Sequence, residues 1–139
     1  WQAEPRRPLP LPQHRVGVAL VPPPSLVNPR IEARLSTMLE TGAMEEVGIL
    51  LERRPDALRL PIAKVHGLRE IAAVLQGRTG PEPARAAIAA QIRRYAKRQR
   101  TWFRHQLPNL EPMPVLGSEP ALAGDLIARV RRRLDRPGR

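Results

Sequence analysis

The chain has 139 residues, with 24 Lys and Arg against 13 Asp and Glu, which gives a net charge of +11 and a pI near 11.7. It contains no Cys, so disulfides, thiolate zinc sites and thiol catalysis are excluded. Aromatic residues make up 3% of the chain and 17 residues are Pro, so we expect a core of Leu, Ile, Val and Ala. No apolar run reaches the length of about 18 residues that a membrane span requires, and no secretory signal opens the chain, so we expect a cytoplasmic protein without membrane contact.

The two ends of the chain differ in composition from its middle. Residues 1–13 contain four prolines and few large apolar side chains, which predicts an irregular lead-in. We expect one folded unit over residues 14–116 and an amphipathic basic helix over residues 117–139. The first residue is Trp1 and the first Met is Met38, so we expect the chain to be part of a longer protein.

The first predicted element is a strand. Val16, Val18 and Leu20 alternate with Gly17 and Ala19, which indicates a strand that packs closely through its small-residue face. The three consecutive prolines at 22–24 are expected to end it.

Helical patterns fill most of the remaining chain. Asn28 before Pro29 predicts the cap and first turn of a helix that Gly42 ends or kinks, with a second segment stopped by Pro55. A third helix is predicted over residues 68–76. Capping-box spacing between Thr79 and Glu82 then predicts the longest helix, roughly residues 83–106. A short strand at 114–116 and a last helix follow, the helix carrying Leu122, Leu126, Ile127, Val130 and Leu134 on one face.

The longest predicted helix is strongly basic, because residues 83–110 contain no acidic residue. The helical period places Arg93, Lys97, Arg100 and Arg104 in one stripe, with Arg94, Arg98, Thr101 and His105 beside it. An apolar core face is predicted on the opposite side, formed by Ile88, Ile92, Tyr95, Gln99, Trp102 and Phe103.

This imbalance of charge indicates a polyanionic partner. Like charges one turn apart repel unless something anionic offsets them, although a solvated basic face is the simpler alternative. Phosphate contacts from such a stripe would set affinity and register without reading bases. Trp102 and Phe103 suit base stacking as well, but their spacing favours a place in the core.

Residues 94–104 read RYAKRQRTWFR, which resembles the RYAKRQ-x-TWFR signature of bacterial tRNA dimethylallyltransferases. Residues 30–34, RIEAR, followed by Met38, Gly42 and the EEV of residues 45–47, are similar to another segment of that family. Residues 67–71, GLREI, with Leu75 and Gly77, and the opening Trp1-Gln2 also match in order and spacing. The resemblance covers most of the chain and is weakest after Leu110.

The resemblance implies a fold class and a reaction. The fold would be α/β, the mostly helical C-terminal portion of a P-loop-type parallel-sheet protein, here with one or two strands and about five helices. The reaction would transfer a dimethylallyl group from dimethylallyl diphosphate to the exocyclic amine of the adenosine beside the tRNA anticodon, assisted by Mg²⁺. The family's phosphate loop and general-base Asp are not found in these 139 residues, so we expect the chain to be inactive alone. Separately, we expect the parent enzyme to be monomeric.

The family's functional positions can be carried over to this sequence. Its diphosphate-side Arg falls on Arg34, for which a solvated Arg near Glu32 is the simpler reading. Its tRNA-contacting positions fall on two segments: Lys64, Val65, His66, Gly67, Leu68 and Arg69, and Lys97, Arg98, Gln99, Arg100, Thr101, Trp102, Phe103 and Arg104. Gly67 would allow close backbone approach to a nucleotide or simply begin a helix.

The histidines and the remaining acidic residues do not suggest a catalytic or metal site. His14, His66 and His105 are too scattered to suggest a metal site or a catalytic triad, and Glu70 is expected to be a structural ion-pair partner. Residues 25–29 and residues 91–92 depart from the family pattern. A function from a different class stays open: a non-catalytic, basic, helical RNA- or DNA-binding module.

Overall fold

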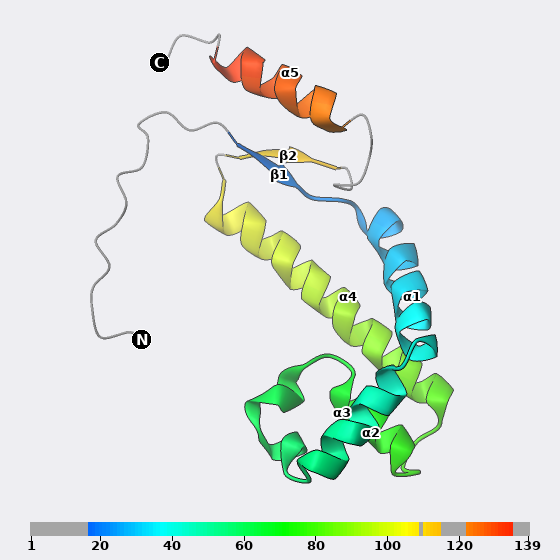
Figure 1. Ribbon diagram of the computed structural model, residues 1–139. Coiled ribbons are helices and arrows are strands. Elements are labelled where there is room, and N and C mark those ends of the chain that lie inside the picture. Colours follow the sequence, from blue (N-terminus) through cyan, green and yellow to red (C-terminus); the bar gives the residue numbers. More distant parts are fainter. Residues whose placement is uncertain (1–16, 109, 115–121, 135–139) are drawn as a thin grey trace, which may run out of the picture.

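A short parallel sheet and a cluster of helices make up the structure, a computed structural model that describes residues 17–108, 110–114 and 122–134 (Figure 1). Strand β1 (Val18–Leu20) pairs in parallel with β2 (Glu111–Met113), with Val18 opposite Glu111 and Leu20 opposite Met113. The predicted lead-in at residues 1–13, the start of the predicted strand and residues 115–121 lie outside the described residues. β2 precedes the strand expected at 114–116.

The small-residue face of β1 is the packed face, as the alternation predicts. Ala19 is buried, whereas Leu20 is exposed. A Cβ on Gly17 would lie 2.9 Å from a side-chain carbon of Leu110, so a larger residue does not fit there without movement of Leu110. Glycine and alanine therefore let the chain after the long helix return close to β1.

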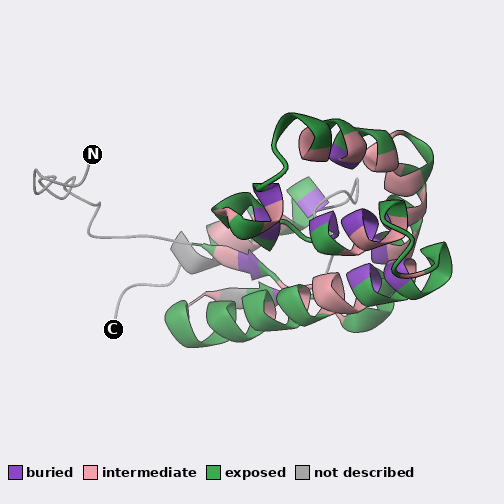
Figure 2. Cartoon of the chain, turned by 90° about the horizontal axis from the view of Figure 1, so that it is seen from below, coloured by how far each residue is buried: buried purple, intermediate pink, exposed green. Residues whose placement is uncertain are grey.

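Helices α1 (Pro24–Glu40), α2 (Ala43–Arg53), α3 (Leu68–Leu75) and α4 (Pro81–Gln106) build the core. Two 3-10 turns, η1 (Ala57–Arg59) and η2 (Pro61–Lys64), connect α2 to α3. Figure 2 shows the buried residues gathered where these helices meet. The core cluster consists of Leu35, Val47, Leu68, Ile71, Ala72, Ile88 and Ala89. The core is thus aliphatic and free of aromatic rings, as the composition predicts.

Two predicted helix starts are wrong. Helix α1 begins at Pro24 rather than near Pro29, because Pro24 occupies the first turn and the amides of Leu26 and Val27 donate to the carbonyl of Pro23 at 3.0 and 3.2 Å. Pro29 therefore lies inside the helix. Helix α4 begins at Pro81 after Gly80, without a side-chain cap, so the predicted capping box does not form.

Glycines and a local ion pair shape the turns between the helices. Gly42 and Gly77 have φ of 119° and 67°, a region that favours glycine, and they follow α1 and α3 as predicted. After α2, Arg54 pairs with Asp56 at 3.2 Å, and this guanidinium lowers the pKa of the Asp56 carboxyl through hydrogen bonding. Helix α5 (Leu122–Leu134) follows β2. No helix in the described part of the chain has the length and apolar character needed to cross a bilayer.

Candidate nucleic-acid interface

Helix α4 is much longer than the helix that supports it. Its 26 residues extend about 39 Å at the usual rise, whereas α3 has 8 residues. Ala84, Ile88 and Ala89 are buried against α3 and its neighbours. Beyond them the helix runs on towards the sheet (Figure 1), and residues 97–108 are all exposed apart from the half-buried Arg100. The second half of α4 is therefore a surface element.

The predicted apolar face of α4 belongs to the core only in the first half of the helix. Ile88 is 1% exposed and Ile92 is half-buried, as expected. Tyr95, Trp102 and Phe103 are 45%, 55% and 38% exposed, so the prediction that they are core residues is wrong. The physical reason is length, because the helix continues past the short α3 that covers its first turns.

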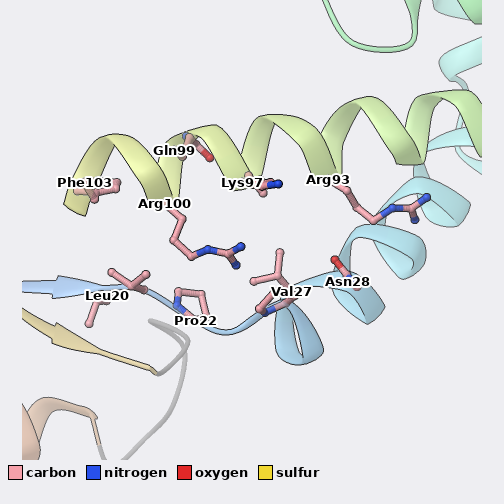
Figure 3. A pocket seen from close by; sticks show the side chains of 12 residues that line it. Leu20, Pro22, Val27, Asn28, Arg93, Lys97, Gln99, Arg100 and Phe103 are labelled. Carbon is pink, nitrogen blue, oxygen red and sulfur yellow. The ribbon is translucent and has the colours of Figure 1, made fainter. Parts of the chain in front are cut away.

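The predicted cationic stripe turns towards the rest of the chain. Arg93, Lys97 and Arg100 line a cavity of about 400 Å³, facing Leu20, Pro22, Val27 and Asn28 of β1 and the start of α1 (Figure 3). A second cavity of about 410 Å³ follows towards the end of α4, lined by Lys97, Arg100 and Arg104 on one side and by Ala19, Val21 and Pro112 on the other. The stripe therefore lines a cationic groove with an apolar opposite wall.

One member of the stripe is already paired within the chain. The Arg93 guanidinium donates to the Glu32 carboxylate of α1 at 2.5 Å, and Arg85 lies 3.8 Å from the same carboxylate. Arg85 also donates to the Ser36 hydroxyl at 2.8 Å. Among the described residues no carboxylate lies within 4.0 Å of Lys97, Arg100 or Arg104. Arg93 thus links α4 to α1. The charges of Lys97, Arg100 and Arg104 are not paired with a carboxylate of the described residues and are available to an anionic ligand.

Both predicted tRNA-contacting segments contact Tyr95 of α4, which belongs to neither of them. The His66 ring, which precedes α3, packs edge-to-face on the Tyr95 ring of α4 with centroids 5.3 Å apart. The Arg98 guanidinium lies over the same Tyr95 ring, 5.8 Å from its centroid. Lys64 and Val65 are exposed beside His66 in sequence. Residues 64–66 and the middle of α4 therefore form one continuous surface.

Residues 67–69, the second half of the predicted tRNA-contacting segment 64–69, make contacts within the fold. Gly67 caps α3 with a φ of 94° and is buried, with Ile88 carbons 3.5–3.7 Å from the position of a Cβ. Leu68 belongs to the core cluster, and Arg69 donates to the Leu58 carbonyl at 2.8 Å. The positive φ and the close packing explain why a glycine stands at the start of α3. Close approach of a nucleotide to the backbone of Gly67 stays a prediction.

The predicted diphosphate ligand lies on α1. Arg34 is exposed, between the core residues Ile31 and Leu35, and it is not among the residues that line the groove. Glu70 accepts a hydrogen bond from the Gln91 amide instead of forming the ion pair we expected. Within the described ranges, no three His, Asp or Glu side chains gather where they could hold a metal ion.

Two contributors to this surface were missed at the sequence level. Glu32 is expected only as a neighbour of Arg34, although a helix with no acidic residue after Glu82 must find ion-pair partners on other helices, and Glu32 is an acid on such a helix. The spacing of Tyr95 matches that of Ile88 and Ile92 and so predicts a core position, but Tyr95 is 45% exposed. The sequence of α4 does not show that the short helix α3 covers only its first turns.

Comparisons with known proteins agree with this architecture. The family model "IPP transferase" matches residues 1–106. A tRNA dimethylallyltransferase of Rhodopseudomonas palustris (strain HaA2) is 44% identical over 108 residues, which is 78% of this chain and 34% of that protein. One from Gluconobacter oxydans (strain 621H) is 44% identical over 105 residues, 76% of this chain and 31% of that protein.

A solved structure shares the fold. The crystal structure of a tRNA delta(2)-isopentenylpyrophosphate transferase from Staphylococcus epidermidis matches with a TM-score of 0.67 and 25% identity, over 85% of this chain and 37% of that one. This likeness confirms the predicted α/β, mostly helical fold. The chain spans about a third of the length of the curated relatives it matches. Because the family model covers most of the chain, and the relatives agree with it, the chain belongs to the IPP transferase family.

Proposed function

We propose that this chain is the RNA-binding part of a tRNA dimethylallyltransferase. The exposed second half of α4, which carries the RYAKRQRTWFR segment, is the observation that carries this proposal. It presents Lys97, Arg98, Arg100 and Arg104 with no acidic residue on the same half of the helix. A tRNA backbone is the polyanion that offsets such a surface, and binding to it releases counterions.

The proposed reaction divides between this chain and the rest of the enzyme. The exocyclic amine of an adenine attacks the first carbon of the dimethylallyl group, the carbon–oxygen bond to the diphosphate breaks, and the amine gives its proton to the family's general-base Asp, which is not found in these 139 residues. This chain positions the tRNA through α4 and residues 64–66 and stabilises the departing diphosphate through Arg34. Arg34 suits this role because its guanidinium is always charged and exposed to a ligand brought from outside the chain.

The only reason to include magnesium in the proposal is the resemblance to the family. When bound, it would neutralise charge on the diphosphate as the carbon–oxygen bond breaks. The described residues offer no cluster of acidic or imidazole ligands, so no residue of this chain is assigned to hold it and no step above depends on it. A monomeric parent enzyme in the cytoplasm, with dimethylallyl diphosphate as donor, completes the proposal.

A chimeric enzyme tests this function directly. The 139-residue chain would replace the matching third of the Rhodopseudomonas palustris relative, and transfer of a labelled dimethylallyl group to tRNA would be measured with magnesium present. We expect transfer by the chimera and none by the 139-residue chain alone. A folded chimera that binds tRNA but transfers nothing would favour the alternative, a basic RNA-binding module without a catalytic role.

A further inference from the structure

Helix α5 carries basic residues that the proposed function does not use. Residues 126–134 contain four arginines and no acidic residue, and they lie beyond the match to the family model, which ends at residue 106. Arg131 and Arg132 are both exposed. Among the described residues, no carboxylate lies within 4.0 Å of either guanidinium. Their charges are therefore available to an anionic partner.

The apolar side of α5 is the covered side. Leu122 is 7% exposed, and Leu126 and Val130, one and two turns later, are half-buried. A helix that binds a lipid surface inserts its apolar side, which α5 already uses within the fold. Ile127 is exposed, but a single side chain buries too little apolar area to hold a helix at a bilayer. The two exposed arginines therefore suit a polyanion in water rather than a lipid surface.

The basic ends of α4 and α5 lie at the same end of the sheet. Helix α4 ends at Gln106 and β2 begins at Glu111, so the end of α4 is close to the start of β2. Figure 1 shows the sheet between α4 and α5, with α5 running back against the direction of β2. Arg131 and Arg132 belong to the last turns of α5 and therefore lie at the same end of the sheet as Arg104. A polyanion held at the end of α4 can continue onto α5.

The residue types of α5 favour a paired RNA stem as this polyanion. The two Trp, one Tyr and one Phe of the chain all precede Arg104, so α5 offers charge without a ring on which a base could stack. Double-stranded RNA hides its bases and is bound mainly through its shape and backbone. Guanidiniums pair with phosphate oxygens in a two-point geometry. Continuity with α4 favours the stem over an acidic protein, because an RNA held there by its loop presents its stem phosphates next.

We propose that Arg131 and Arg132 bind phosphates of the paired stem that closes the RNA loop. This inference rests on the proposed function, in which α4 holds the tRNA, and it adds a second binding site on a helix beyond the family-model match. Contacts on both sides of the sheet fix the direction of the stem relative to α4, because phosphate contacts set register and orientation. The same contacts carry no sequence information, so the site accepts stems of any sequence.

Binding of two RNAs to the 139-residue chain tests this proposal. One is a hairpin, and the other is its loop sequence as an unpaired strand. Arg131→Gln combined with Arg132→Gln should flatten the slope of log K against log salt for the hairpin by about 1.4–1.8, for two lost phosphate contacts. At about 0.1 M salt this change lowers the binding constant for the hairpin about 25-fold. Binding of the unpaired strand should stay within about 2-fold, because it has no stem.

Matched variants separate phosphate contact from net charge and from folding. Arg53→Gln combined with Arg59→Gln removes the same charge from exposed positions of α2 and η1 and should leave hairpin binding within about 2-fold, because salt screens distant charges. Arg131→Lys combined with Arg132→Lys keeps the charge and should keep most of the slope. Cations in the last turn also stabilise a helix, so circular dichroism would establish that each variant keeps its helix content.

Several results would overturn the stem proposal. They are an unchanged hairpin slope in the α5 Gln variant, equal losses for the hairpin and the unpaired strand, the same loss in the control variant of α2 and η1, and no hairpin binding by the folded chain at low salt. Binding to anionic phospholipid vesicles that disappears in the α5 Gln variant would assign the arginines to a membrane surface instead. Dimethylallyl transfer by the chimera is measured separately: transfer with an unchanged slope refutes the stem contact alone, and a flattened slope without transfer refutes the proposed function alone.

Discussion

Glu32 links helix α1 to helix α4 through ion pairs. Its carboxylate accepts a hydrogen bond from Arg93 at 2.5 Å and lies 3.8 Å from Arg85, both on α4. Its own helix, α1, carries Arg34 two residues later. The ion pairs therefore add to the core packing of Leu35 and Ile88 that holds α1 against α4.

Replacing Glu32 by Gln should weaken the fold modestly. All three side chains are more than a third exposed, so solvent screens the pairs and we expect a loss of about 0.5 kcal/mol in unfolding free energy. Urea denaturation at low and high salt would measure it, and high salt should shrink the difference. Glu52→Gln, at an exposed position of α2, is the matched control and should change little. A loss that salt leaves untouched would contradict an ion-pair origin.

Arg34→Ala tests the proposed contact to the leaving diphosphate. In the chimeric enzyme we expect turnover to fall by about 100-fold, because charge on a leaving group is stabilised most in the transition state. Equilibrium binding of tRNA should stay within about 2-fold, because the proposed phosphate contacts lie on α4 and not at Arg34. Single-turnover transfer and tRNA binding would be measured on the same preparation. Equal losses in both, or the same loss in Arg53→Ala at an exposed position of α2, would remove Arg34 from this role.

At the scale of elements, α4 shows what a helical period predicts and what it leaves open. Its end at Gln106 and its division into a cationic and a ring-bearing side follow from spacing alone. The period does not say which side faces the rest of the chain. In the first half Ile88 faces the core, whereas in the second half Arg93, Lys97 and Arg100 line the groove and Trp102 is exposed. Which side of α4 is covered depends on contacts with segments distant in sequence, and the local spacing of residues does not predict those contacts.

Gly67 and Gly48 predict opposite responses to Ala. Gly67 has a φ of 94° at the start of α3, so Gly67→Ala should cost about 1–2 kcal/mol of unfolding free energy from backbone strain. Gly48 lies inside α2, and a Cβ there would meet Leu75 at an ordinary distance of 3.9 Å. Gly48→Ala should therefore stabilise the chain by about 0.5–1 kcal/mol. Urea denaturation of both variants checks the signs, and equal effects would contradict the strain argument.

The basic residues of α4 should differ in their contribution to salt dependence. Lys97 has no carboxylate partner among the described residues, so Lys97→Ala should flatten the slope of log K against log salt by about 0.7–0.9 for a lost phosphate contact. Arg93 is neutralised by Glu32, so Arg93→Ala should flatten the slope much less. Titrations of tRNA binding for both variants test this order. An equal change in slope would show that the Glu32 pair opens on binding.

At the scale of the whole molecule, the elements were easier to predict than their contacts. Apolar spacing and glycine stops predicted α2, α3 and α5 closely. The start of α1 was missed because Pro24 and Pro29 suit a first helical turn equally well. Strand β2 was misplaced because it contains Pro112 and exists through pairing with β1, more than 90 residues away. The contact of His66 with Tyr95 is likewise tertiary, so the place of His66 beside α4 has no local signal.

The measurement that reaches the central claim most directly is the salt dependence of tRNA binding to the folded 139-residue chain. If Lys97, Arg98, Arg100 and Arg104 each contact one phosphate, log K should fall with log salt at a slope of about −3. Circular dichroism on the same sample would establish that the helices are formed. A slope near zero, or no binding at low salt by the folded chain, would contradict the claim that this third of the enzyme carries its RNA-binding surface.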